Sequence, residues 1–176
     1  MKRLSVFFVT ILALVVAPLV HAEPIQLTDQ QIVSIRLGCT SALQGIKQVQ
    51  ETEAASRVNR GRAYERTLRL LSALNSRVAL SKLDAPVLTS TTARIQQRLT
   101  DFQEHYIDYA NKMDDVLGTK CTEAPVTFYD KLTTAREARA RIAEDINEID
   151  ALLDQYQTAV NELKTTIADL EKGVTQ

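Results

Sequence analysis

Glycine, proline and histidine are scarce in this chain of 176 residues, which contains five, four and two of them, respectively. Few helix-breaking residues, together with many Ala, Leu, Glu, Gln and Arg residues, favour helices over strands. No stretch alternates between polar and apolar residues convincingly enough to indicate a strand. The composition therefore predicts an all-α protein.

The shortage of histidine also leaves few candidates for a catalytic base. Only His105 lies beyond the apolar N-terminal segment, so a Ser-His-Asp triad has one candidate base and no nucleophile-elbow sequence. Asp101 and Asp108 share a helix side with His105 and could hold a metal weakly, but a di-iron bundle site needs two Glu-x-x-His elements. We interpret these three residues as a solvated polar face, and we expect no enzyme activity and no cofactor.

The chain begins with the pattern of a secretory signal peptide, residues 1–22. Lys2 and Arg3 precede an almost unbroken apolar stretch, 4–16, and small residues follow a proline at its end. An uncleaved membrane anchor is the alternative, which the proline and the polar junction disfavour. We predict an exported mature chain, 23–176, in the periplasm, on the cell surface or in the medium, without stable membrane insertion.

The charge balance gives no indication of a nucleic-acid partner. The chain has 21 Lys and Arg and 22 Asp and Glu, a net charge of −1, which becomes −3 when two basic and no acidic residues leave with the signal peptide. Nucleic-acid binding requires a concentrated basic surface. We therefore expect no nucleic acid, and an envelope or extracellular protein as the partner.

A seven-residue apolar repeat dominates the C-terminal part of the chain and predicts a helix over about 125–171. Pro125 suits its first turn, where a missing N–H is tolerated. Spacings of four and three keep one apolar stripe along the helix, as in a coiled coil, and only Arg139 is charged. The members of this stripe are Phe128, Leu132, Ala135, Arg139, Ile142, Ile146, Ile149, Leu153, Tyr156, Val160, Leu163, Ile167 and Leu170.

A second repeat predicts a helix over about 89–117, which the capping-prone run 89–92 opens and Gly118 closes. A third helix is predicted over about 29–82, where Thr28 and Gln31 have the spacing of a capping box. Its apolar stripe changes phase after Val49. A stutter in one long helix, or a break near Gly61, would explain the change, and we favour continuity.

The three helices predict an elongated, up-down-up, three-helix antiparallel bundle with coiled-coil packing, and all of 23–176 forms one domain. Three stripes on one chain could bury one another in a monomer, or leave apolar surface for a homodimer. The two connections fall at 83–86 and 118–124.

An even pair of cysteines in an exported chain predicts a disulfide, here between Cys39 and Cys121. Two inert thiols, or a catalytic thiol that would need an activating base nearby, are the alternatives. The disulfide would set the first and third helices in register and place Arg139 level with Glu53.

The same register places a basic segment level with acidic residues of the third helix. The basic segment could pair inside the bundle or lie in solvent, or it could contact an anionic polymer, lipid or protein partner. Its residues are Arg57, Arg60, Arg62, Arg66 and Arg69, and the acidic residues are Glu144, Asp145, Glu148, Asp150 and Asp154.

The run Leu27-Thr28-Asp29-Gln30-Gln31 is similar to the Leu-Thr-x-x-Gln motif of the Spy and CpxP-like periplasmic chaperones, although those proteins repeat the motif and this chain has one copy. The resemblance implies an exported helical protein that binds unfolded clients. The physical interpretation of the same residues is a helix cap. We predict an exported interaction or structural protein, a spacer or docking module of the cell envelope, with a chaperone-like function as the alternative.

Overall fold

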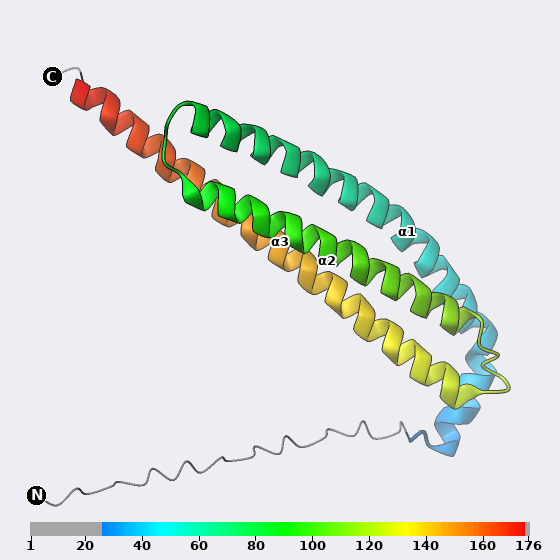
Figure 1. The fold of residues 1–176 in the computed structure, drawn as a ribbon. Helices are drawn as coiled ribbons and strands as arrows, with labels where there is room; N and C mark the ends of the chain where they lie inside the picture. Colours follow the sequence, from blue (N-terminus) through cyan, green and yellow to red (C-terminus); the bar gives the residue numbers. More distant parts are fainter. Residues whose placement is uncertain (1–25, 175–176) are drawn as a thin grey trace, which may run out of the picture.

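The computed structural model describes residues 26–174 and has three helices within them (Figure 1). Helix α1 spans Asp29–Leu80, α2 spans Pro86–Leu117 and α3 spans Pro125–Val174. The helices run up, down and up, which confirms the predicted all-α three-helix bundle. None of these described helices is long and apolar enough to cross a membrane. The predicted signal peptide, 1–22, lies outside the described residues.

Helix α1 is one continuous helix, as we favoured, and the alternative of a break near Gly61 is wrong. The capping box at its start is present, because the Gln31 amide donates to Thr28 Oγ1 at 3.3 Å and Gln31 Oε1 accepts from the Thr28 amide at 2.8 Å. A Cβ added at Gly61 would meet no atom within 4 Å outside the helix backbone. The helix curves gently with its convex side outward (Figure 1), as long helices on a core often do.

Helix α2 begins three residues earlier than predicted. Pro86 occupies its first turn and Ala85 precedes it without a side-chain cap. The Thr-rich run that we expected to cap the helix lies inside it, where Thr91 and Thr92 are buried. The Thr92 hydroxyl donates to the Leu88 carbonyl oxygen within α2 and accepts from Asn75 of α1, each at 2.8 Å. This run therefore packs inside the bundle and does not open the helix.

The tightest packing in the bundle joins α2 and α3. Two series of α3 side chains, each repeating every seven residues, are buried. The central series belongs to the predicted stripe, and small side chains in the second series let α2 approach closely. The central series is Phe128, Ala135, Ile142, Ile149 and Tyr156, and the second, α2-facing series is Ala138, Asp145, Leu152 and Ala159.

Between Phe128 and Val160, the remaining members of the predicted α3 stripe form an outer series that α1 covers only in part. Four of these side chains are half-buried, and Arg139 is exposed. The sequence pattern predicted burial of this series. It missed the α2-facing series, because alanines and an aspartate do not form a recognisable apolar stripe. The outer series is Leu132, Arg139, Ile146, Leu153 and Val160.

Polar side chains tie the three helices together near the α1–α2 turn. Asn75 of α1 donates to the Thr92 hydroxyl of α2 at 2.8 Å and accepts from the Tyr156 hydroxyl of α3 at 2.7 Å. Deeper along α2, His105 Nδ1 lies 2.6 Å from the carboxylate of Asp145, which is only 4% exposed. The buried carboxylate therefore has a specific partner, as buried charges require.

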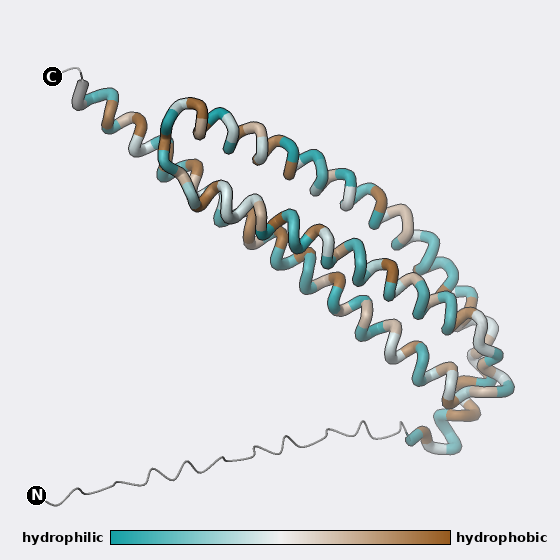
Figure 2. Tube along the Cα trace, in the orientation of Figure 1, coloured by the Kyte–Doolittle hydropathy of each residue, from teal (hydrophilic) through white to brown (hydrophobic). Residues whose placement is uncertain are grey.

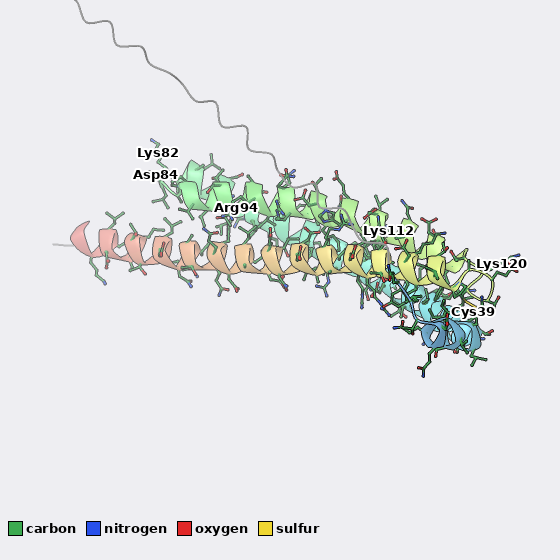
Figure 3. All side chains as sticks on the ribbon, turned by 90° about the horizontal axis from the view of Figure 1, so that it is seen from below. Cys39, Lys82, Asp84, Arg94, Lys112 and Lys120 are labelled. Carbon is green, nitrogen blue, oxygen red and sulfur yellow. A yellow bond between two sulfur atoms is a disulfide. The ribbon has the colours of Figure 1, made fainter. Side chains whose placement is uncertain are left out.

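The predicted disulfide between Cys39 and Cys121 is present, with its Cα atoms 5.7 Å apart and both residues buried. It joins α1 to the connection between α2 and α3. Both bundle ends carry a projecting helix: the first turns of α1 extend past this connection near Cys39, and the last turns of α3 extend past the turn that holds Lys82 and Asp84 (Figures 1 and 3).

Removal of the imidazole at position 105 will destabilise the bundle. We expect His105→Ala to lower the free energy of unfolding by about 1–3 kcal/mol in urea denaturation, because Asp145 would stay buried without its partner. The control is His105→Ala combined with Asp145→Leu, which extends the apolar α2-facing series and should recover most of the loss. Equal stabilities of the single variant and the parent would contradict this role of the pair.

Loss of the disulfide will loosen α1 at its N-terminal end. The cross-link closes a loop of 82 residues, so Cys39→Ala with Cys121→Ala should lower the free energy of unfolding by up to about 4.5 kcal/mol. Hydrogen exchange should accelerate in α1 residues 29–46, while the α3 core at 135–156 serves as the internal control. Unchanged protection of 29–46 would show that packing alone holds this end.

Candidate binding groove between α1 and α3

An open groove of about 810 Å³ separates the middle of α1 from α3, and we call it the α1–α3 groove. Phe102 and Tyr106 of α2 form its floor, and Ile142 and Ile146 of α3 form an apolar wall. The opposite wall is polar and comes from α1. It consists of Gln48, Val49, Thr52, Glu53, Ser56, Arg57 and Arg60.

The polarity of α1 explains why the groove stays open. The stripe of α1 changes phase after Val49, and the trace of α1 is mostly hydrophilic along its middle (Figure 2). Polar side chains such as Thr52, Glu53 and Ser56 therefore line the groove opposite α3. Burial of these groups against the α3 wall would remove their hydration without hydrogen-bond partners. The helix therefore stands away from α3 at this level and packs mainly on α2.

Contacts between the helices bound the groove at both ends and cross it once. The Cys39–Cys121 disulfide lies at one end, and at the other the Tyr64 hydroxyl donates to Asp150 at 3.3 Å. Between them, the Arg139 guanidinium lies 2.6 Å from the Glu53 carboxylate. This ion pair confirms the predicted register of Arg139 and Glu53.

Four arginines and one glutamate line the groove, so its local charge is positive in a chain of net charge −1. The Arg57 guanidinium stacks 4.8 Å above the ring centre of Tyr106. Burial, followed by the nearby Glu53 carboxylate, raises the pKa of Tyr106, and its phenol is uncharged at neutral pH. The arginines, Arg57, Arg60, Arg136 and Arg139, thus surround an apolar, neutral floor.

The structure divides the predicted basic segment between two faces of α1. Arg57 and Arg60 line the groove. The other three arginines are exposed and lie at least about 120° around the helix axis from both, at about 100° per residue. These outward-facing residues are Arg62, Arg66 and Arg69.

Ion pairing with the acidic residues of α3 was one of the alternatives left open for the basic segment, and the two segments are level. Among residues 26–174, none of the five arginines forms an ion pair with those carboxylates. Instead, Asp145 bonds to His105, and Glu148 accepts from Arg98 at 3.1 Å. Asp145 and Glu148 thus interact with α2, while Asp150 accepts from Tyr64 of α1.

No group of His, Cys, Asp and Glu in the described part of the chain is arranged to hold a metal ion. The three residues that share a side of α2 have separate partners. Asp101 pairs with Arg98 at 3.2 Å, His105 bonds to Asp145, and Asp108 pairs with Arg141 at 2.9 Å and with Lys112. The hydrogen bond from Lys112 is the main cause that lowers the pKa of Asp108.

No protein-family model, curated protein or solved structure matches the chain. The five residues that are similar to the chaperone motif are those at the start of α1, where Thr28 and Gln31 form the capping box. The groove is therefore interpreted from its own geometry. Two features of the sequence pointed to this region. Arg139 is a charged residue in the apolar stripe of α3, and the apolar stripe of α1 changes phase at the same level.

The ion pair across the groove will contribute modestly to stability. A double-mutant cycle with Glu53→Arg and Arg139→Glu should give a coupling energy of about 0.2–1 kcal/mol, since Arg139 is 63% exposed and solvent screens the pair. The double reversal should recover the loss caused by each single reversal in urea denaturation. A coupling energy of zero would show that the two groups are level without stabilising each other.

Proposed function

We propose that this protein is a non-enzymatic binding module that presents the α1–α3 groove on a long helical rod. The observation that carries the proposal is the incomplete cover of α3, because an apolar series that its own chain leaves half-exposed offers surface to a partner. The arginines at the rim add charge for orientation and selectivity. The lining of the groove has no His or Cys, and its one carboxylate, Glu53, is paired with Arg139.

The compartment proposed for this module is the cell envelope or the extracellular space. The N-terminal sequence pattern predicts export, and the disulfide supports an oxidising environment, where such bonds persist. The 50 residues of α3 would extend about 75 Å, a length that suits a spacer between envelope components. Docking in the groove and spacing along the rod are compatible roles for one protein.

Chaperone-like binding of unfolded clients is the second candidate, and the apolar floor of the groove is the observation in its favour. Such a protein would bind many sequences through the apolar side chains that remain accessible in the groove, such as Ile146, and it would suppress the aggregation of unfolded proteins. A docking module would bind a defined partner and leave aggregation unchanged. The two candidates therefore differ in the number and folding state of the bound proteins.

Site-specific photocrosslinking will test the proposed function. A photoreactive residue at Ala143, which lines the groove, should form a crosslink to one component of a native envelope extract. The matched control is the same residue at Arg62, on the outward face of α1, which should not. Equal crosslinking from both positions, or none from Ala143, would contradict a binding role for the groove, whereas many unfolded clients would favour the chaperone.

A further inference from the structure

Positive charge is concentrated in the C-terminal half of α1. Between residues 57 and 82 the sequence has six arginines and one lysine but a single acidic residue, Glu65, in a chain of net charge −1. Helices α2 and α3 each carry more acidic than basic residues. The bundle therefore has a basic side, which α1 forms (Figure 1).

The helical period brings four of these arginines to one side of α1, which we call the outer basic face. At about 100° per residue, they lie within about 80° around the helix axis. They are Arg62, Arg66, Arg69 and Arg77, and all four are exposed. This face lies on the convex side of α1, away from α2 and α3 (Figure 1). Lys82 continues the positive charge on the turn that follows α1 (Figure 3).

None of the arginines of the outer basic face forms an ion pair within residues 26–174. Arg62 and Arg66 are four residues apart, and Arg66 and Arg69 are three apart, so like charges are neighbours on the helix surface and repel each other. Salt only screens this repulsion. An anionic surface would remove it, because each guanidinium group would then have a partner of opposite charge.

Two exposed leucines belong to the same side of α1. Leu80 is 83% exposed and lies within the arc of the four arginines, and Leu70 is 71% exposed and lies about 20° around the axis from Arg77. A hydrated anionic polymer offers no apolar surface to such side chains. The boundary of a bilayer offers both, since lipid phosphates lie beside acyl chains there. The combination of arginine and leucine therefore favours a phospholipid surface.

We propose that the outer basic face binds the surface of a bilayer that contains anionic phospholipids. Helix α1 lies along the bilayer, its arginines donate to lipid phosphates, and Leu70 and Leu80 enter the boundary between headgroups and acyl chains. The segment from Arg62 to Leu80 extends about 27 Å at 1.5 Å per residue, a length that spans several headgroups. This surface is distinct from the α1–α3 groove, and its binding does not depend on the function proposed for the groove.

The charges of the other two helices set the orientation of the bound protein. Because α2 and α3 are acidic overall, an anionic bilayer repels them and attracts α1. Only the orientation with α1 toward the lipid brings the leucines and the arginines to the surface together. The rod therefore lies flat, with α1 as its contact edge.

Co-sedimentation with vesicles will test the proposal on the purified protein with its disulfide intact. The protein should bind vesicles of phosphatidylcholine mixed with an equal amount of phosphatidylglycerol, and it should not bind vesicles of phosphatidylcholine alone. Arg62→Glu with Arg66→Glu should weaken binding by about tenfold or more, because two favourable charges become unfavourable. Leu70→Ser with Leu80→Ser should weaken it by about fivefold or more, because less apolar surface is buried in the lipid.

Helix α3 provides the matched control for the charge change. Arg136→Glu with Lys164→Glu alters the net charge by the same amount at two exposed positions outside the outer basic face. This variant should bind the mixed vesicles within about twofold of the parent, since solvent screens charges beyond about 8 Å. Circular dichroism will confirm that each variant is folded.

Several outcomes would overturn the proposal. These are equal binding to the two kinds of vesicle, binding to neither, or an equal loss in both charge variants. Heparin, a sulfated polysaccharide, is the probe for a soluble polymer. Binding of heparin that the leucine variant retains and the arginine variant loses, without vesicle binding, would assign the face to such a polymer. The crosslinking at Ala143 and Arg62 counts protein partners, and a lipid adds no protein band, so the two proposals fail separately.

Discussion

A helix with apolar side chains on more than one side needs a neighbour on each of those sides, and α3 has only one close neighbour. Helix α2 covers the central and α2-facing series, and its fit depends on small residues such as Ala138. The polar stretch of α1 cannot cover the outer series at the level of Glu53 without loss of hydration. The curvature of α1, the open groove and the exposed arginines all follow from this mismatch.

Long apolar repeats and the breaks between them predicted the helices and their order, because these depend on local pattern. The disulfide was predicted separately, from an even pair of cysteines in a chain with an export signal. The burial of individual α3 residues was harder to predict. A heptad stripe marks an apolar face, but the width of the buried face depends on how closely each neighbour approaches. Ala138 and Asp145 are buried because α2 is close, whereas Arg139 and Ile146 remain accessible because α1 is distant.

The groove could be predicted only in part, for the same reason. The sequence indicated that Arg139 and Glu53 would be level, and the structure brings them together. It also placed five arginines in one segment, but helical geometry separates Arg57 and Arg60 from the other three. The acidic residues of α3 were level with them, as predicted, yet Asp145 and Glu148 face α2. Residue counting predicts which residues lie at the same height along the bundle. The direction in which each helix face points depends on packing and is not predicted by counting.

Buried polar groups define the alignment of the helices more strictly than apolar heptads do. An apolar seam can slip by seven residues and still match, but the contacts of Asn75 with Thr92 and Tyr156 exist in only one alignment. The pair of His105 and Asp145 makes the same demand on α2 and α3. We interpret these groups as determinants of register, a role attested for buried polar residues in coiled coils.

Helix α1 is attached to the rest of the bundle at two widely separated points. The disulfide at Cys39, which lies past the projecting first turns of α1, fixes it at one point, and the short turn after Leu80 fixes its other end. A rod held in this way cannot swing open like a hinged lid, so its span can move only by flexing. Flexure distributes a small displacement over many backbone hydrogen bonds, which makes the groove elastic: it can widen or narrow around its contents and return to its resting width when they leave.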